Sequence, residues 1–205
     1  MARQGVFIVF EGIDGSGKST HIKLLCHELS RQGYDVLHTS EPSQGRIGSF
    51  IREYAEHRRR RLPAEVEALL FAADRFEHTR QVVEPALERG CIVVSDRYLH
   101  SSLAYQGAEG LSLDWIRELN RFALKPDLSI FLDISPETGL GRMRRRRRTV
   151  FEDFAYQQRV RNQYLGLVDR GELVKVDAER PVHEVKEDII NLVRGLLRTL
   201  GVPPR

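Results

Sequence analysis

The chain has 205 residues, which is enough for one domain with a sizeable core and too few for a second full domain. Its 32 Lys and Arg residues nearly balance its 29 Asp and Glu residues, and the formal net charge of +3 argues against a nucleic-acid partner bound through bulk charge. An apolar content of 41% excludes a disordered chain. No apolar run approaches the ~18 residues of a membrane span, and the start lacks a signal-peptide layout, so we expect a cytoplasmic protein without a membrane partner.

Five short apolar runs alternate with longer amphipathic segments along the chain. The runs are typical of strands covered on both faces, and they span residues 6–10, 36–40, 91–95, 128–132 and 173–177. Helical spacing is found over residues 18–32, 47–57, 64–89, 112–123, 136–147, 151–170 and 182–200. This alternation predicts an α/β fold with a five-stranded parallel sheet and helices on both faces. No linker interrupts the pattern, so we expect a single domain over residues 1–205.

The strongest motif directly follows the first predicted strand. It reads G-I-D-G-S-G-K-S and satisfies G-x-x-x-x-G-K-[ST], the phosphate-binding P-loop. Such a loop turns backbone N–H groups toward one anion, and the helix that follows adds its positive end. We expect Lys18 to reach the outer phosphates and the Ser19 hydroxyl to ligate Mg²⁺. The predicted triphosphate site comprises Gly12, Ile13, Asp14, Gly15, Ser16, Gly17, Lys18, Ser19 and Thr20.

Two further features of the sequence narrow the class of nucleotide-binding protein. A GTPase would carry the tetrapeptide N-K-x-D for guanine, and the sequence contains none. A large ATPase would need a longer chain. Kinases of small molecules therefore fit the sequence better than these two classes.

The third predicted strand ends in Asp96-Arg97-Tyr98. A carboxylate at the end of a strand beside a P-loop is placed to hold Mg²⁺, usually through water. A guanidinium next to the metal site could bind a second phosphate, that of an acceptor. A surface ion pair at a strand end is an equally good interpretation of Asp96 and Arg97 taken alone.

Phe71 and Arg75 stand four residues apart on a predicted helix and therefore share one face. An aromatic ring and a guanidinium on one stripe could stack on a nucleobase and hydrogen-bond to it. The simpler interpretation puts Phe71 in the core and pairs Arg75 with Glu67, Glu77 or another acid.

Arginines are dense after the fourth predicted strand, at Arg142 and at residues 144–148. Such a density of charge cannot be buried. A lid over about residues 142–152 would bring positive charge to the γ-phosphate and exclude water. A solvated face and a nucleic-acid patch are the alternatives. A second run, over residues 58–61, is interpreted as a solvated helix end.

Several blocks in a fixed order resemble the thymidylate kinase family. They are F-E-G-I-D-G-S-G-K-S-T, E-P, I-R, L-L-F-A-A-D-R, D-R-Y, S-S-x-A-Y-Q-G and K-P-D-L-S-I-F-L-D, and the resemblance runs from Val6 to about Val168. It implies the fold of a P-loop nucleoside monophosphate kinase with an Arg-rich lid. It also implies transfer of the γ-phosphoryl group of ATP to dTMP with Mg²⁺, giving dTDP and ADP in dTTP synthesis, by a homodimer.

The resemblance also implies roles for single residues. Arg52 and Arg97 would lie at the acceptor phosphate, with Asp96 near Mg²⁺. Phe71 would stack on thymine and Arg75 would hydrogen-bond to it. The whole implied acceptor site comprises Asp14, Glu41, Pro42, Arg52, Phe71, Arg75, Arg97, Ser102 at the base edge, Tyr105 under the sugar where it disfavours a 2′-hydroxyl, and Gln106 nearby.

The source of the catalytic arginine differs within this family. Some members carry an Arg inside the P-loop, where this chain has Gly15, and others place it in the lid. Gly15 and the Arg-rich segment resemble the second group, so the implied catalytic residues are Lys18, Arg97, Arg142, Arg144 and Arg148.

Two departures and two alternatives accompany the resemblance. After Glu41-Pro42 the chain has Ser43-Gln44-Gly45 where the family often has G-G-T, and the acids of the family's D-R-x-E lid motif are missing around Arg148. One alternative function is a kinase of another nucleotide, such as a uridylate kinase. The other is a P-loop regulator or ATPase that holds nucleic acid with its Arg runs.

Overall fold

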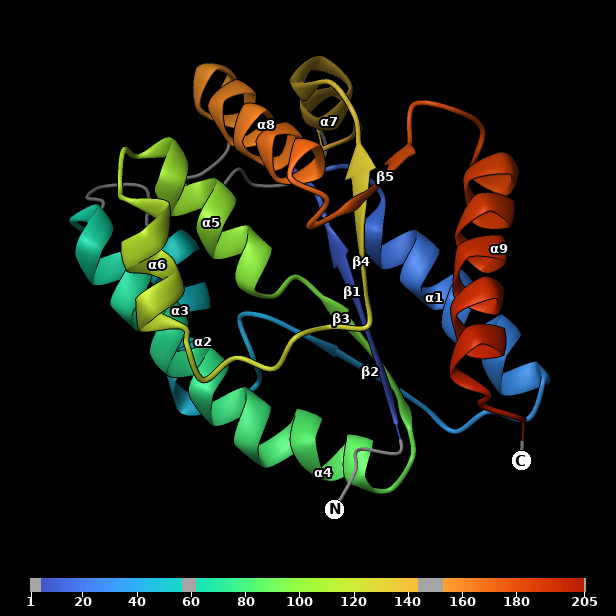
Figure 1. Ribbon diagram of the computed structural model, residues 1–205. Coiled ribbons are helices and arrows are strands. Elements are labelled where there is room, and N and C mark those ends of the chain that lie inside the picture. The colour runs from blue at the N-terminus through green and yellow to red at the C-terminus, as the bar shows by residue number, and fades with distance from the viewer. Residues whose placement is uncertain (1–4, 57–61, 144–152, 205) are drawn as a thin grey trace.

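The structure is a computed structural model that describes residues 5–56, 62–143 and 153–204 (Figure 1). Five strands form one parallel sheet in the order β2-β3-β1-β4-β5. Their bounds are β1 (Val6–Glu11), β2 (Val36–Ser40), β3 (Ile92–Asp96), β4 (Leu128–Asp133) and β5 (Val174–Asp177). The predicted sheet is confirmed, and each strand boundary lies within one residue of its prediction.

One face of the sheet is covered by α1 (Lys18–Arg31) and α9 (Val182–Leu200), which pack against each other on the right of Figure 1. The central strand β1 is buried over its whole length. Its side chains Ile8 and Phe10 join a core cluster that includes Ile22 of α1 and Ile189 of α9. This apolar burial on both sides explains why β1 reads as an unbroken hydrophobic run.

The opposite face carries most of the remaining helices, on the left of Figure 1. They are α3 (Ala64–His78), η1 (Thr79–Val83), α4 (Glu84–Glu88), α5 (Leu99–Ala108), α6 (Leu113–Leu119) and α8 (Phe154–Asp169), and α2 (Arg46–Glu56) packs on α3. Phe7 and Val9 of β1 point to this side, where they pack against Val83 and Leu87. Helices therefore cover both faces, as predicted.

The helical prediction needs correction in two places. The single helix predicted over residues 64–89 runs as α3, the π-helical turn η1 and α4 in succession. No helix was predicted at residues 99–108, where α5 lies. This helix packs against α3, α6 and α8 and is buried on most of its surface, so it lacks the apolar stripe that marks an amphipathic helix.

The helix predicted over 136–147 is described as α7 (Pro136–Arg142), which lies at the carboxyl end of the sheet (Figure 1). Most of the predicted lid, with Arg144 and Arg148, lies outside the described residues, and so does the Arg run at 58–61. Across the part of the chain that is described, no helix is both long and apolar enough to cross a membrane. The cellular compartment stays a prediction.

Candidate active site

The loop between β1 and α1 follows the predicted phosphate-binding geometry. Gly12, Gly15 and Gly17 all have positive φ angles of 148°, 81° and 92°, a region that side chains rarely adopt. Helix α1 begins at Lys18 without a side-chain cap from Gly17. The N-terminus of α1 therefore meets the loop without a side-chain cap, which is the arrangement that binds an anion in this motif.

Lys18 points back into this loop rather than into solvent. Its Nζ donates to the backbone carbonyls of Gly12 and Ile13 at 3.0 and 3.1 Å. Burial, followed by the nearby Arg97 guanidinium, lowers the pKa of Lys18 to about 8. The buried Ser16 Oγ in the same loop has no hydrogen-bond partner among the described residues. Loop and lysine therefore carry polar groups that phosphate oxygens would satisfy.

The two predicted magnesium ligands lie together. The Ser19 hydroxyl donates to Asp96 Oδ2 at 3.1 Å, joining the first turn of α1 to the end of β3. A hydroxyl and a carboxylate are the hard oxygen ligands that Mg²⁺ prefers. Clusters of three or more His, Cys, Asp or Glu side chains suited to a metal do not occur among the described residues. The donor set therefore fits Mg²⁺ that shares its remaining coordination between phosphates and water.

Arg97 follows directly after β3 and reaches the P-loop. Its Nη1 donates to the Gly12 carbonyl at 3.1 Å, and its Nη2 donates to Asp14 Oδ1 at 2.6 Å. Nη2 also donates to Tyr105 Oη at 3.2 Å, and the guanidinium lies over the Tyr105 ring, 5.0 Å from its centroid. Because burial raises the pKa of Tyr105, its phenol stays neutral. The structure thus brings together three residues predicted from separate segments.

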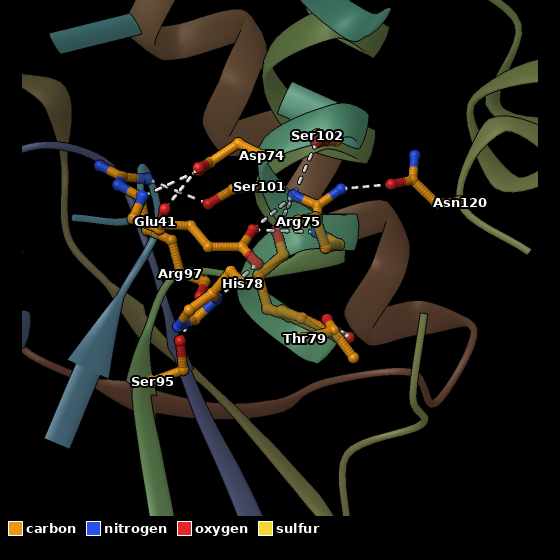
Figure 2. Close-up of polar contacts among 12 residues, drawn as sticks. Glu41, Asp74, Arg75, His78, Thr79, Ser95, Arg97, Ser101, Ser102 and Asn120 are labelled. Carbon is orange, nitrogen blue, oxygen red and sulfur yellow. Dashed lines mark hydrogen bonds and ion pairs between the residues drawn. The ribbon is translucent and has the colours of Figure 1, made fainter. Parts of the chain in front are cut away.

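Arg75 lies deeper, in the buried cluster drawn in Figure 2. Its Nε donates to Glu41 Oε2 at 2.9 Å, and its Nη1 donates to Asn120 Oδ1 at 2.5 Å. Its Nη2 donates to the Tyr98 carbonyl and to Ser102 Oγ, both at 3.0 Å. The acidic partner is Glu41, so Arg75 pairs with an acid other than Glu67 or Glu77, as one of the alternatives from the sequence allowed. Three side chains and one backbone carbonyl, from four different elements or loops, thus fix the orientation of this guanidinium.

The segment after β2 is fixed to α3 and α2. Glu41 also faces His78, whose Nδ1 lies 3.3 Å from Glu41 Oε1, and a cis peptide bond precedes Pro42. Ser43 donates to Asp74 from its backbone N–H and from its hydroxyl, at 2.8 and 2.6 Å. Arg52 donates to the carbonyls of Pro42 and Ser43. Arg52 therefore holds this loop.

The remaining predicted residues fall at different depths. Phe71 is half-buried on the same helix as Arg75, and Thr20 is exposed on the first turn of α1. Gln106 is buried beside Tyr105, and its Oε1 has no hydrogen-bond partner among the described residues.

Comparison with known proteins supplies the family. Residues 10–189 match the family described as thymidylate kinase. The chain is 46% identical to a probable thymidylate kinase of Pyrococcus abyssi, over 93% of this chain and 97% of that protein. It is 44% identical to a probable thymidylate kinase of Thermococcus gammatolerans and 41% identical to one of Staphylothermus marinus, in both cases over 92% of this chain and at least 94% of the relative. This chain belongs to the thymidylate kinase family.

Within this thymidylate kinase fold, Arg142 is the one predicted lid arginine that the structure describes. It is exposed at the end of α7. Its Nη1 donates to the Gly15 carbonyl at 3.4 Å, and its Nη2 donates to the Ala178 carbonyl at 3.2 Å. Arg142 therefore bridges the P-loop and the segment after β5, on the triphosphate side of the predicted site.

Two residues in contact with the candidate site were missed by sequence reasoning. Asn120 accepts from Arg75 and is anchored by its own Nδ2, which donates to the Ile116 carbonyl at 2.8 Å. Glu11 ends β1 and is fully buried. Asn120 carries no local signal in a single sequence. Glu11 stands inside a family-like block, but no chemistry at that position drew attention to it.

Proposed function

We propose that this chain transfers the γ-phosphoryl group of ATP to dTMP, giving dTDP and ADP, at the site between the P-loop and Arg97. The family and the names of its relatives support this reaction. The main support for this location of the site is that Arg97 hydrogen-bonds both to Gly12 and to Asp14, at 3.1 and 2.6 Å. A guanidinium in that position stands between a triphosphate on the P-loop and an acceptor phosphate beside it.

Phosphoryl transfer mainly requires that the two substrates are held close together and that positive charge surrounds the phosphates. The acceptor is already an anion, so no strong general base and no covalent intermediate are needed. Lys18 and the backbone of residues 12–19 bind the donor phosphates, with Thr20 next to them. Arg97 binds the acceptor phosphate and keeps it close to the γ-phosphate. When bound, Mg²⁺ would neutralise phosphate charge, and Ser19 and Asp96 are the residues that would hold it.

In this proposal, the nucleoside of the acceptor binds next to Arg75. Arg75 is oriented by Glu41, Ser102 and Asn120, and it hydrogen-bonds to thymine. Phe71, on the same helix, stacks on the base, and Tyr105 lies under the sugar with Gln106 beside it. Arg52 and the loop at Pro42 complete the site near the acceptor phosphate.

The proposal includes a single P-loop kinase domain over residues 1–205 with a lid at about 142–152. Arg142, Arg144 and Arg148 are its candidates for the charge that neutralises the transferring phosphoryl group. The contact of Arg142 with Gly15 supports a place for this segment on the donor side. Single Arg→Ala variants assayed for kcat identify which of the three matters.

A homodimer is also part of the proposal. Apolar side chains Val66, Leu69 and Phe76 stand at helical spacing along α3 and are 38, 50 and 46% exposed, and Phe50 of the neighbouring α2 is 51% exposed. An exposed apolar stripe of this kind is typical of an interface between subunits. Sedimentation of the full chain should give a dimer, and Leu69→Glu should give a monomer.

One assay tests the reaction itself. ADP release from Mg·ATP is measured with dTMP, dUMP, UMP, CMP, AMP and GMP in parallel, and without acceptor. Strong stimulation of ADP release by dTMP alone supports the proposal. Stimulation by UMP or CMP instead would show that the acceptor is another nucleotide, while the P-loop assignment would still hold. Lys18→Ala should lose transfer while staying folded. Arg97→Ala should weaken dTMP far more than ATP, and equal weakening of both would remove Arg97 from the acceptor site.

A further inference from the structure

Glu11 is a buried carboxyl group for which the proposed transfer has no use. It is the last residue of β1 and directly precedes the P-loop, and it is 0% exposed. Burial raises its pKa, while the hydrogen bond from Ser101 and the attraction of Arg97 oppose that effect. A carboxyl group is expensive to bury unless its oxygens are hydrogen-bonded, so its partners should reveal what it does.

Those partners lie at the start of α5. Glu11 Oε1 accepts from the backbone N–H groups of Tyr98 and Ser101, at 2.9 and 3.1 Å. Oε2 accepts from the hydroxyls of Ser101 and Tyr164, at 2.6 and 2.8 Å. Helix α5 has no side-chain cap from its own N-cap residue, Tyr98. A carboxylate of β1 therefore caps a helix that lies far away in the sequence.

The residue just before that helix is Arg97, and its backbone is unusual. Its φ is 72°, the only positive value among the described residues other than glycine. The N–H of Arg97 donates to the Phe10 carbonyl at 2.8 Å, and Ser95 Oγ donates to the Arg97 carbonyl at 2.8 Å. Glu11 fixes the next peptide N–H, that of Tyr98. A left-handed Arg persists only where its surroundings hold it, and these bonds do so.

The Arg97 side chain is linked to Glu11 as well. Ser101 Oγ donates to Glu11 Oε2, and the same oxygen accepts from Arg97 Nη1 at 3.2 Å (Figure 2 draws Arg97, Ser95 and Ser101). A carboxylate accepts but does not donate, so it orients the Ser101 hydroxyl and leaves its lone pairs for the guanidinium. Carboxylate, hydroxyl and guanidinium thus form a directed chain.

We propose that Glu11 is a positioning residue, which fixes the backbone of Arg97 and, through the Ser101 hydroxyl, aims its guanidinium at the acceptor phosphate. This inference rests on the proposed function, in which Arg97 binds that phosphate. Glu11→Gln keeps the shape of the side chain but replaces one acceptor oxygen by an amide NH₂ that meets N–H or O–H donors. The variant should therefore misplace Arg97 without removing it.

A double-mutant cycle tests this chain of contacts. Equilibrium dissociation constants of dTMP and of ATP are measured by calorimetry on the full chain, its Glu11→Gln and Arg97→Ala variants and the double variant. Glu11→Gln should raise the Kd of dTMP about tenfold and change that of ATP less than about twofold. In the Arg97→Ala background the same change should add almost nothing, because its effect acts through Arg97.

A matched control separates position from stability. Asp127 Oδ2 accepts from the Phe7 N–H at 2.7 Å at the other end of β1, so Asp127→Asn makes the same chemical change in contact with the same strand. It should lower the unfolding midpoint and leave the Kd of dTMP unchanged. Ser101→Ala keeps the Glu11 carboxylate but removes the hydroxyl link, and it should weaken dTMP in the same Arg97-dependent way.

The outcomes distinguish the two proposals. If Arg97→Ala leaves the Kd of dTMP unchanged, the assignment of Arg97 to the acceptor phosphate is wrong. Suppose instead that Arg97→Ala raises the Kd of dTMP. The positioning role of Glu11 is then wrong if Glu11→Gln leaves that Kd unchanged. It is also wrong if Glu11→Gln raises the Kd by the same factor in the wild-type and the Arg97→Ala backgrounds. If Glu11→Gln does not fold, Ser101→Ala in the same cycle decides by the same criterion.

Discussion

The carbonyl oxygen of Gly139 lies 2.3 Å from the position that a Cβ atom on Gly15 would take, so the P-loop and α7 meet backbone to backbone. The approach is close from both sides, because a Cβ atom on Gly139 would lie 2.6 Å from the Asp14 carbonyl. This geometry gives a physical reason for Gly15 in this chain. An arginine at that position would displace the helix that leads to the predicted lid.

Gly15→Ala should therefore impair catalysis. The new methyl group meets backbone that has little room to move, and φ at this position is 81°, which disfavours any side chain. We expect a fall of at least about tenfold in kcat/KM for ATP, measured by steady-state ADP release. Gly141→Ala, in α7, is the control, since a Cβ atom there meets nothing within 4 Å. Equal losses in both variants would contradict this account.

Glu41→Ala should destabilise the fold strongly. Glu41 and Arg75 form an ion pair of 2.8 Å whose side chains are 3% and 1% exposed, and removal of the carboxylate leaves a buried guanidinium without its anion. We expect a loss of about 3–5 kcal/mol in the free energy of unfolding, measured by urea titration. Glu84→Ala breaks the exposed pair with Arg80 and should cost less than about 1 kcal/mol. Similar values for the two would show that burial of the first pair is unimportant.

Activity should decline in alkaline solution because of Lys18. Its pKa is lowered to about 8, chiefly by burial, so the ammonium loses its proton as the pH rises through that value. Above pH 8 we expect kcat/KM for ATP, which reports the enzyme before ATP binds, to fall about tenfold for each further pH unit. Steady-state rates between pH 7 and 9.5 at saturating dTMP measure this. A flat profile over that range would be the contrary result.

Mild acid should destabilise the fold through His100. Burial lowers the pKa of this histidine to about 4, and its Nδ1 has no hydrogen-bond partner among the described residues. The unfolded chain binds a proton near pH 6.5, the folded chain only near pH 4, so stability falls as the pH drops between these values. Between pH 7 and 5 this histidine should account for a loss of about 2 kcal/mol. Urea titrations of wild type and His100→Gln at pH 7 and pH 5 measure this loss in the free energy of unfolding. The variant should lose about 2 kcal/mol less than wild type. Equal losses in the two proteins would show that His100 is not the cause.

The sequence predicted the strands well because all but the edges of this sheet are buried on both faces, which leaves long apolar runs such as that of β1. The P-loop was predictable because its function needs fixed residues at fixed spacing. Helix α5 was not, since its burial on most sides removes the periodic pattern that marks a helix at a surface. Its absence from the prediction also hid the capping role of Glu11.

Contacts between residues far apart in the sequence could not be predicted either. Arg75 and Asn120 are 45 residues apart, and Glu41 lies 34 residues before Arg75. A single sequence suggested that Arg75 pairs with an acid but held no information on which one. Such partners follow from the order of strands in the sheet and from helix packing, and therefore only from the structure.

Because Arg97 is already bonded to Asp14, an anion can bind Arg97 here only if it interacts more favourably than this carboxylate does. An arriving anion must compete with a carboxylate already 2.6 Å from Arg97 Nη2, so its net gain is the difference between two sets of charge-assisted bonds. A weakly basic monoanion such as chloride offers less than the carboxylate it would displace. A phosphate dianion, with more charge and three acceptor oxygens, offers more. We therefore expect the Asp14 carboxylate to disfavour the binding of small monoanions at Arg97 without any steric barrier.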